Sequence, residues 1–216
     1  MSAAADRRLV LASNNAKKIK ELQALLGATG VTLVAQGELG ISEADEPHPT
    51  FVENALAKAR HAAAASGLPA IADDSGLCVD ALGGHPGVQS AHFAPIERDP
   101  AEDREAHRAR QDAANNARLL ADLATADNRR ARFVCTLVAV RSADDPEPLI
   151  AFGRWEGEIR PEPAGSGGFG YDPLMQIPAL GSAVAELDAE VKNRHSHRAL
   201  ASAQMVKLMT EVWGLG

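Results

Sequence analysis

Two adjacent acids, Asp73 and Asp74, follow a short apolar run at residues 70–72. Such a run is typical of a buried strand, and α/β proteins bind their ligands beyond the carboxyl ends of these strands. Because Ser75 and Gly76 come next, the segment indicates a metal site or a general base at a strand end. The alternative is a solvated turn whose acids cap local backbone groups. The rest of the chain has to decide between the two.

Strand-like and helix-like segments alternate at the start of the chain. Residues 9–12 and 32–35 are apolar runs of strand type. Between them, Ile19, Leu22 and Leu26 recur at the spacing of one helix face, and a polar turn joins the first strand to this helix. This order of elements is typical of a ligand-binding α/β protein.

Two longer helices are expected further along the chain. Thr50 and Glu53 have the spacing of a capping box, which predicts a helix over residues 50–66. The residues of this helix expected to face the core are Val52, Ala55, Ala59 and Ala62. The acid–proline pair at residues 99–100 predicts another helix that runs to about residue 123, with a polar middle that is mostly a solvated face.

The second half of the chain adds strands and a last helix. Residues 132–141 and 148–159 predict the two strands of a hairpin, and residues 174–177 predict a further strand. A C-terminal helix is expected over residues 196–213, with core residues Leu200, Ala203, Val206, Met209 and Trp213. No repeat or linker interrupts the 216 residues, so we expect one domain over residues 1–216. Together these elements predict an α/β fold: a mixed β-sheet flanked by helices, with a cleft between two lobes.

The composition limits the partners and the compartment. A net charge of −7 argues against a protein that coats duplex nucleic acid, because neutralising phosphates requires a basic face. It still allows a small phosphate ligand held by a few basic residues and a divalent cation. Cys78 and Cys135 lie in apolar runs, which favours small buried hydrophobes in a reducing compartment. Without a membrane-length span or a signal-peptide core, we expect no membrane partner and a cytoplasmic location.

Residues 13–18 are a candidate phosphate site. They lie between a predicted strand and a helix N-terminus, where free amides and the helix dipole favour an anion. Lys17 or Lys18 would add positive charge. The alternative is a capped helix with exposed lysines.

The loop before the second helix is a candidate metal site. Asp45 and Glu46 lie in this loop, and Lys58 lies near the middle of the helix. Oxygen ligands such as Glu46 and Asp74 suit Mg²⁺, which keeps several waters and bridges phosphate oxygens. The alternative is that the loop acids are only solvated.

Two later segments could hold a nucleotide base. Glycines at 165, 167, 168 and 170 surround Phe169, Tyr171 and Asp172; such glycines allow close backbone approach to a ligand, and an aromatic ring can stack on a base. Residues 192–198 are the densest basic cluster of this acidic chain. If Ser196 caps the last helix, the cations in its first turn oppose the helix dipole unless a ligand compensates them.

These segments, in this order, resemble the Ham1 family of non-canonical purine nucleoside triphosphate pyrophosphatases, which act on inosine and xanthosine triphosphates. The resemblance spans nearly the whole chain, from Val10 to Arg198. Its motifs are Ser-x-Asn-x-x-Lys at 13–18, Phe-x-Glu-Asn-Ala-x-x-Lys-Ala at 51–59, Ala-Asp-Asp-Ser-Gly-Leu at 72–77, Gly-Gly-x-Pro-Gly at 83–87, Gly-Gly-Phe-Gly-Tyr-Asp-Pro at 167–173 and Ser-His-Arg at 196–198.

The resemblance implies roles for these residues. Asp74 would be the proton acceptor and a magnesium ligand, Glu46 would help to hold the metal, with Asp45 beside it, and Lys58 would lie close to the phosphates. The triphosphate would be bound by Ser13, Asn14, Asn15, Ala16, Lys17 and Lys18, and Ser75 would contact the substrate. The base pocket would comprise Phe169, Gly170, Tyr171, Asp172, Lys192, His197 and Arg198. The family resemblance also implies an elongated α/β fold with a central active-site cleft, and a homodimer.

The expected reaction is hydrolysis of ITP, dITP and XTP to the nucleoside monophosphate and pyrophosphate. Rejection of adenine requires a donor facing the purine 6-oxo group, for which Arg198, His197 or a backbone amide near Phe169 is the candidate. One alternative is a Maf-like pyrophosphatase that acts on modified pyrimidine nucleotides. Another is a non-catalytic nucleotide sensor, which would be marked by loss of Asp74, Glu46 or Lys18; all three are present.

Overall fold

The computed structural model describes residues 7–215 of the chain, apart from the side chain of Ala28. The prediction that the start of the chain carries no signal-peptide core falls partly on residues 1–6, which lie outside the described residues. The chain forms two compact units. Unit 1 comprises Met1–Asp74, Cys135–Gly153 and Ser196–Gly216, and unit 2 comprises Ser75–Val134 and Arg154–His195.

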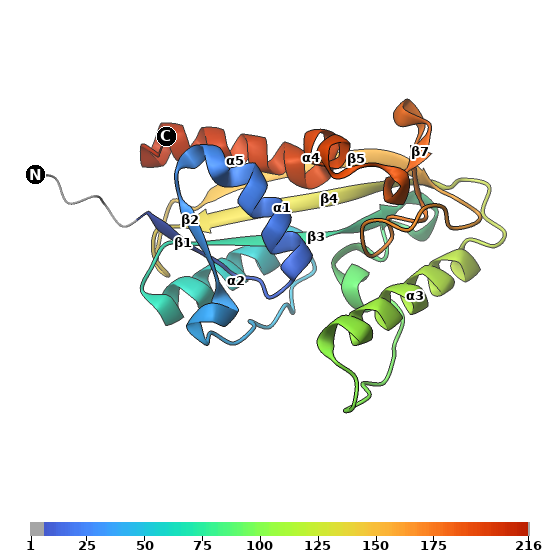
Figure 1. Ribbon diagram of the computed structural model, residues 1–216, viewed down its shortest axis with the longest axis horizontal. Helices are drawn as coiled ribbons and strands as arrows, with labels where there is room; N and C mark the ends of the chain where they lie inside the picture. Colours follow the sequence, from blue (N-terminus) through green and yellow to red (C-terminus); the bar gives the residue numbers. More distant parts are fainter. Residues whose placement is uncertain (1–6, 216) are drawn as a thin grey trace, which may run out of the picture. The chain divides into compact units, whose positions relative to one another are not determined.

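The strands form one open mixed sheet in the order β2-β1-β3-β4-β5-β6-β7 (Figure 1). Strand β1 is parallel to β2 and β3, whereas β6 is antiparallel to β5 and β7. The predicted mixed sheet flanked by helices is thus confirmed. The strands are β1 (Arg8–Leu11), β2 (Thr32–Ala35), β3 (Ala70–Val79), β4 (Arg130–Val140), β5 (Leu149–Ile159), β6 (Met175–Ile177) and β7 (Ser182–Ala183).

Four of the five α-helices were predicted from the sequence, one of them with a wrong start, and α4 was not predicted. They are α1 (Ala16–Leu26), α2 (Phe51–Ser66), α3 (Arg104–Asp122), α4 (Ala189–His195) and α5 (His197–Trp213). Short 3₁₀ helices occur at Gly27–Thr29, Gln36–Leu39, Asp80–Leu82, Gly87–His92, Pro178–Leu180 and Val184–Glu186. Thr50 caps α2, because its hydroxyl accepts a hydrogen bond from the Glu53 amide at 3.4 Å. The Glu53 carboxylate accepts from the Thr50 hydroxyl at 2.5 Å, so only one half of the predicted capping box is seen.

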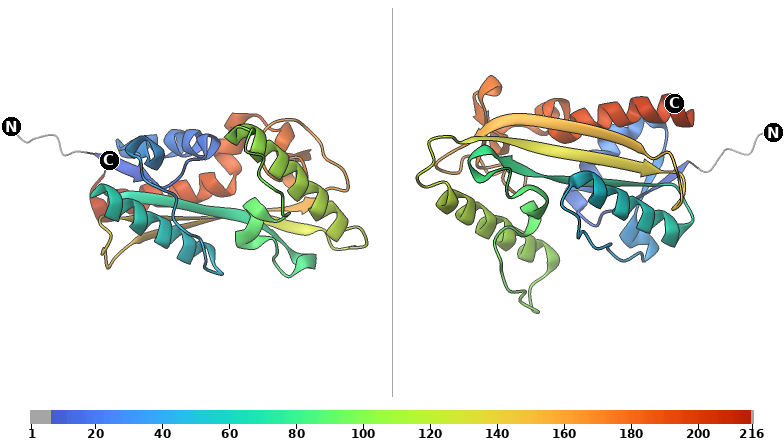
Figure 2. Two further views of the ribbon diagram at one scale, coloured as in Figure 1. Left: turned by 90° about the horizontal axis from the view of Figure 1, so that it is seen from below. Right: turned by 180° about the vertical axis from the view of Figure 1, so that it is seen from behind.

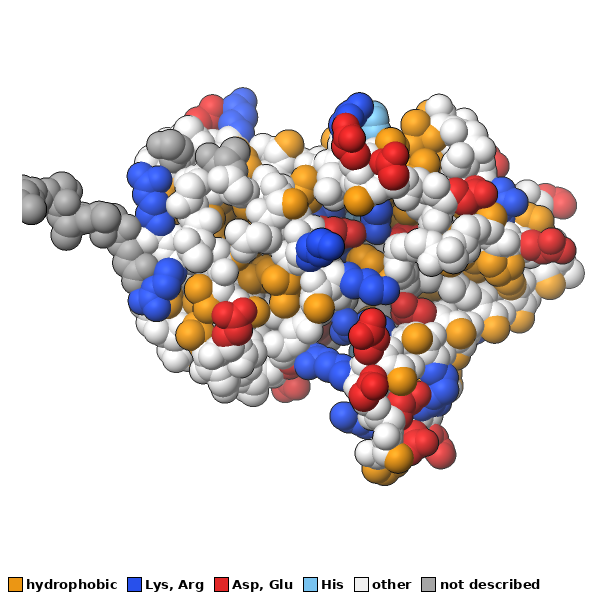
Figure 3. Space-filling view, viewed as in Figure 1, with side chains coloured by type: hydrophobic (Ala, Val, Ile, Leu, Met, Phe, Trp, Pro, Cys, Tyr) orange, Lys and Arg blue, Asp and Glu red, His pale blue; other side chains and the backbone are white. Residues whose placement is uncertain are grey.

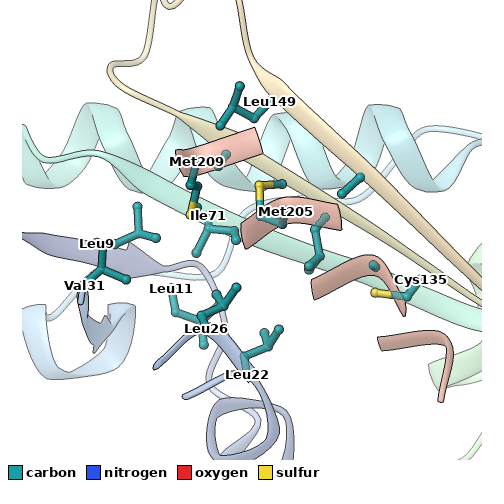
Figure 4. Packing of buried hydrophobic residues seen from close by; sticks show 14 residues of the cluster. Leu9, Leu11, Leu22, Leu26, Val31, Ile71, Cys135, Leu149, Met205 and Met209 are labelled. Carbon is teal, nitrogen blue, oxygen red and sulfur yellow. The ribbon is translucent and has the colours of Figure 1, made fainter. Parts of the chain in front are cut away.

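Unit 1 has three layers because its central strands alternate between two apolar faces (Figure 2). Leu9 and Leu11 of β1 pack against α1 and α5, whereas Val10 and Ala12 pack against the alanines of α2. The first face is shown in Figure 4, where its cluster includes Leu22, Leu26, Ile71, Cys135, Leu149, Met205 and Met209. This alternation positions the site, because successive residues of one strand reach helices on opposite faces.

Unit 2 has its own core. Helix α3 packs there against β6, the C-terminal halves of β3 and β5, and the N-terminal end of β4. Its buried residues include Leu77, Leu119, Leu123, Phe133, Trp155, Tyr171, Leu174 and Met175. The polar middle of α3 is exposed or half-buried, as expected for a mostly solvated face, except at the two buried amides of Gln111 and Asn115. Asn115 Oδ1 accepts from the Ala94 amide at 2.8 Å, and Gln111 Nε2 donates to the Ala94 carbonyl at 2.7 Å.

The predicted start of α3 at residues 99–100 is wrong. Asp103 caps this helix, and its carboxylate accepts from the Glu105 and Ala106 amides at 2.9 and 2.8 Å. Asp99 only closes a local turn, since its carboxylate accepts from the Ala101 amide at 2.9 Å. Two acids four residues apart compete as caps, and the second one begins the helix.

The predicted core stripe of α5 is partly wrong. Leu200 is 45% exposed and Ala203 is also exposed. Ala201, Met205 and Met209 are fully buried instead, spaced four residues apart on the face that meets the sheet. The helix carries two overlapping apolar stripes, which share Met209. The stripe that packs against the sheet begins at Ala201, one residue after the predicted start at Leu200.

The predicted lack of nucleic-acid and membrane partners stays a prediction, on which the surface charge and the helices bear. On the face shown in Figure 3, basic and acidic side chains lie side by side rather than in separate areas. Within residues 7–215, no helix combines the length and the apolar character that a membrane crossing requires.

Candidate active site

The turn between β1 and α1 is organised by its own side chains. Asn15 is the N-cap of α1, and its Oδ1 accepts from the amides of Lys17 and Lys18 at 3.1 and 3.3 Å. Ser13 Oγ accepts from the Asn15 amide at 3.2 Å. Asn14 Nδ2 donates to Glu43 Oε1 at 3.0 Å, while Ala16 and Lys17 are exposed. The helix is capped and Lys17 is exposed, but Lys18 is half-buried against Asp73, so the alternative of a capped helix with exposed lysines holds only in part. Binding of a triphosphate here stays a prediction.

Asp73 is the centre of a buried ionic network in unit 1. Lys18 Nζ donates to Asp73 Oδ1 at 2.6 Å, and Arg198 Nε donates to Oδ2 at 2.8 Å. Cys135 Sγ lies 3.3 Å from the same Oδ2. Arg198 Nη1 also donates to Glu21 Oε2 at 2.5 Å. The network joins α1, β3, β4 and α5, so it fixes the Lys18 side chain relative to the sheet.

The charges of this network compensate one another. Burial alone would raise the pKa of Asp73, but Arg198 and Lys18 hold it well below its usual value. Burial would likewise lower the pKa of Arg198, but Asp73 and Glu21 raise it. Asp73 and Arg198 therefore stay ionised although their side chains are 0% and 1% exposed. A charged pair this deeply buried is stable only when both partners are present.

Asp74 forms a second cluster with α2 and the loop before it. Lys58 Nζ donates to Asp74 Oδ1 at 2.9 Å and to Glu46 Oε2 at 2.7 Å. Burial would lower the pKa of Lys58, but Asp74 and Glu46 raise it. One half-buried lysine thus bridges two carboxylates, and the cluster carries an excess of negative charge.

The Asp74 carboxylate is under-compensated. Burial, with a smaller contribution from Glu46, raises its pKa to about 6 despite the opposing effect of Lys58. Among the residues that the structure describes, Asp74 Oδ2 is buried without a hydrogen-bond partner. A buried acceptor without a partner costs free energy, so this oxygen is a place for a ligand, a water or a cation.

The two carboxylates fit a hard cation such as Mg²⁺. Asp74 and Glu46 share one lysine, and the free Oδ2 of Asp74 adds an unpaired oxygen. Within residues 7–215 no group of three or more His, Cys, Asp and Glu side chains could hold a metal. Mg²⁺ often needs only one or two carboxylates plus substrate phosphates and waters. In the described part of the chain, Asp45 is exposed and makes no hydrogen bond or ion pair.

The two acids lie within a strand and not after its end, which corrects the sequence-based expectation. Strand β3 continues through both acids to Val79. Asp73 and Asp74 are 2% and 7% exposed, so the solvated turn is also wrong. The strand can continue because Asp73 meets cations from α1 and α5 on one face, while Asp74 meets Lys58 of α2 on the other. Ser75 follows in β3 and is half-buried.

Unit 2 contains the glycine loop and Lys192. Asp172 Oδ2 accepts from the Phe169 amide at 2.9 Å and from Lys192 Nζ at 3.0 Å. Lys192 Nζ lies 4.6 Å from the centroid of the Phe169 ring, in a cation–π contact. Tyr171 is buried in the core and donates to the Ser90 carbonyl at 2.9 Å. Phe169 is half-buried, so of the two aromatic residues in this loop it is the one with a partly exposed ring.

Gly168 shows why the loop needs glycine. Its φ is +73°, which L side chains rarely adopt, and a β-carbon there would overlap the Asp172 carboxylate. The carboxylate of Asp172 can therefore approach the backbone closely enough to bind the Phe169 amide. The loop conformation and the position of Asp172 depend on each other.

The predicted base-pocket residues are divided between the units. Phe169, Gly170, Tyr171, Asp172 and Lys192 belong to unit 2, whereas His197 and Arg198 belong to unit 1. As predicted, Ser196 caps α5, and its hydroxyl accepts from the Ala199 amide at 3.1 Å. The anion opposite Arg198 in its first turn is Asp73.

Comparison with known proteins gives one consistent result. A model of the Ham1 family matches residues 9–208. The chain belongs to the Ham1 family. It is 73% identical to a dITP/XTP pyrophosphatase of Leptothrix cholodnii, over 96% of this chain and 99% of that protein. It is 57% identical to a dITP/XTP pyrophosphatase of Burkholderia pseudomallei, over 97% of this chain and 96% of that one.

Solved structures agree with this membership. A Ham1 protein from Coxiella burnetii superposes with a TM-score of 0.83 at 42% identity, covering 95% of this chain and 99% of that one. The Ham1 protein of Staphylococcus aureus gives a TM-score of 0.79 at 33% identity, covering 94% and 97%. The open mixed sheet described above is therefore the Ham1 fold.

The sequence did not predict several residues around the site of this Ham1 chain. It indicated Asp73 only as part of a metal or general-base site and gave Glu21 no role, although both bind Arg198. It also overlooked Asp112 and Asn116 of α3, which bind the backbone of Gly170. The adjacent acids in a strand-like segment were a signal for the role of Asp73. Two neighbouring carboxylates that are both buried face opposite sides of the strand, so each needs its own basic partner. No local signal distinguished Asp112 from other acids of a polar helix.

Proposed function

We propose that this chain hydrolyses non-canonical purine nucleoside triphosphates, namely ITP, dITP and XTP, to the nucleoside monophosphate and pyrophosphate. Its membership of the Ham1 family and the names of its close relatives support this function. The observation that carries it is Asp74, whose Oδ1 binds Lys58 while Oδ2 is buried without a partner among the described residues. A buried carboxylate with one free oxygen is suited to accept a proton from water.

Lysines and a metal would share the charge of the triphosphate. Lys18 is fixed by Asp73 and Lys58 by Asp74, so neither side chain has to be ordered when the substrate binds. Mg²⁺ would be held by Asp74 and Glu46, with Asp45 as a further predicted oxygen ligand, and would neutralise charge on the departing pyrophosphate. Residues 13–18 would contribute the turn that receives the phosphates.

In the proposed reaction, Asp74 orients the attacking water and accepts its proton. The water oxygen bonds to the α-phosphorus, and the bond from this phosphorus to the bridging oxygen breaks. Most of the rate enhancement then comes from positioning and electrostatic stabilisation of the leaving group.

The base would be recognised by Phe169 to Asp172, Lys192, His197 and Arg198, with Ser75 as a further contact. The structure narrows the choice of a donor for the 6-oxo group. The amides of Phe169 and Gly170 are already bound to Asp172 and Asp112, at 2.9 and 2.8 Å. A side chain is therefore the better candidate than either backbone amide.

Further parts of the proposal concern the state of the protein. We propose that residues 1–216 act as one functional domain, that the chain is a cytoplasmic homodimer, and that its partners are purine nucleotides, not nucleic acid or membranes. Light scattering during size-exclusion chromatography tests the dimer, which predicts twice the 22.7 kDa chain mass.

One assay tests the function. Pyrophosphate release is measured from ITP, dITP, XTP, GTP, ATP and pyrimidine triphosphates, with Mg²⁺ and with excess chelator. We expect release from the first three only, and only with the metal. Release mainly from the pyrimidine triphosphates would support a Maf-like enzyme, and tight binding without turnover would support a sensor.

A further inference from the structure

Helix α3 holds Gly170 of the glycine loop from both sides. Asp112 Oδ2 accepts a hydrogen bond from the Gly170 amide at 2.8 Å. Asn116 Nδ2 donates to the Gly170 carbonyl at 3.0 Å. Asp112 and Asn116 are four residues apart, so their side chains leave the same face of the helix. All three residues belong to unit 2.

These two hydrogen bonds fix both soft angles of one glycine. The amide and the carbonyl of Gly170 belong to the two different peptide planes that meet at its α-carbon. Glycine has the largest conformational freedom of all residues, and Gly170 has a φ of +62°. Because each plane is bound to α3, neither can rotate without losing a hydrogen bond.

The orientation of these planes determines where the Phe169 ring lies. Phe169 precedes Gly170, and Tyr171, which follows it, is anchored in the core by its bond to the Ser90 carbonyl at 2.9 Å. The loop therefore has one fixed end at Tyr171, and Gly170 sets the direction in which the chain leaves it. The Phe169 ring, with Lys192 over its face, depends on that direction.

Holding α3 in place does not require these two side chains. The neighbouring residues Gln111 and Asn115 are buried and already bind the segment at Ser90 to Ala94. Asn116 Oδ1, in addition, is buried without a partner among the residues described. Such an acceptor lowers stability, which argues that Asn116 serves the loop and not the stability of the helix.

We propose that Asp112 and Asn116 are positioning residues that fix the Gly170 backbone and thereby set the discrimination between purine bases at Phe169. The inference rests on the proposed function and deepens it. Neither residue has to touch the substrate, since both act through the loop.

The first test compares substitutions at Asp112. Asp112→Ala removes the acceptor, Asp112→Asn keeps an amide oxygen that can accept from Gly170, and Asp122→Asn makes the same change elsewhere on α3. We measure kcat and KM for dITP, XTP and dGTP. Asp112→Ala and Asn116→Ala are expected to lower the dITP-to-dGTP ratio of kcat/KM by about three- to tenfold, mainly through KM for dITP. Asp112→Asn is expected to restore most of the ratio, and Asp122→Asn to leave it unchanged.

The second test does not need activity. Hydrogen exchange of the Gly170 amide is followed by NMR, and we expect Asp112→Ala to accelerate it by at least about tenfold while Asp122→Asn does not. Unchanged exchange would overturn the positioning role. An equal loss for all three substrates together with a lower melting temperature would show a merely structural role and would overturn the proposal. Failure of the proposed function is visible separately, as a wild-type protein that releases no pyrophosphate from dITP or XTP.

Discussion

The two units hold their candidate site residues by different physical means. In unit 1, Asp73 fixes Lys18 and Arg198 on one face of the sheet, and Asp74 fixes Lys58 on the other, all through ion pairs. In unit 2, the loop around Phe169 is held mainly by hydrogen bonds to its backbone, from Asp172 and from α3.

The difference fits the chemistry proposed for each unit. A triphosphate is recognised by charge, so its site needs cations whose positions are set before binding. A flat base is recognised by the shape and the donors of a pocket, so its site needs a backbone held in one conformation. Unit 1 should therefore be sensitive to loss of charge, and unit 2 to loss of backbone geometry.

The largest expected effect is at Asp74. Asp74→Asn keeps the size of the side chain and removes the proton acceptor and the negative charge. Turnover of dITP should fall by roughly two to four orders of magnitude, as for loss of a general base or an electrostatic group. Steady-state pyrophosphate release measures it, with circular dichroism as the control for folding. Near-wild-type turnover would refute the catalytic role.

Asp73→Asn should act on stability as well as activity. The change leaves Arg198 buried with less than its full counter-charge, and it weakens the hold on Lys18. We expect the free energy of unfolding to fall by about 3–5 kcal/mol in urea titrations, the range for breaking a buried pair. Asp80→Asn is the matched control, because Asp80 pairs with Arg132 at the surface, where loss of a pair costs less than about 1 kcal/mol. Equal effects would contradict the importance of burial.

Gly168→Ala tests the backbone of unit 2. The added methyl group would displace Asp172, so we expect KM for dITP to rise about tenfold with a smaller change in kcat. Gly181→Ala is the control that distinguishes backbone strain from overlap with Asp172. Gly181 has a similar φ of +66°, but nothing lies within 4 Å of its β-carbon position. If both variants behave alike, the contact with Asp172 is not responsible.

The smallest expected effect is a pH-dependent one in unit 1. Asp145 accepts from the Arg141 and Glu147 amides at 2.7 and 3.0 Å, and the bond from Arg141 is the main reason that the pKa of Asp145 is lowered. A carboxyl with a lowered pKa stabilises the fold above its unfolded pKa and loses this effect as the pH falls. Asp145→Asn should therefore cost about 1 kcal/mol at pH 7 and progressively less below about pH 4.

Urea titrations at several pH values measure this difference. Asp144→Asn, an exposed neighbour in the same turn, should show no such trend. A constant difference between wild type and Asp145→Asn across the pH range would show that charge is not involved.

Much of unit 1 could be predicted from the sequence because its signals are local. Short apolar runs indicated β1 and β2, and Thr50 with Glu53 marked the start of α2. The partners of Asp73 could not be predicted in this way, because Lys18 and Arg198 lie 55 and 125 residues away along the chain. The family resemblance indicated these residues as a set, but not which side chain pairs with which.

In unit 2 the errors came from competing local signals. Asp99 and Asp103 both fit the start of a helix, and only the packing of α3 against the core decides between them. The buried amides of α3 were hidden in a polar segment, since Gln111 and Asn115 bond to a turn about 20 residues earlier, at separations of 17 and 21 residues.

Because Asp73 and Asp74 are neighbours on one strand, the length of the connection from α2 to β3 matters more than its composition. Sliding β3 by a single position would exchange the faces of the two acids, leaving Asp73 among the alanines of α2 and Asp74 without its lysine. Insertions and deletions between Gly67 and Pro69 should therefore be far less tolerated than substitutions there.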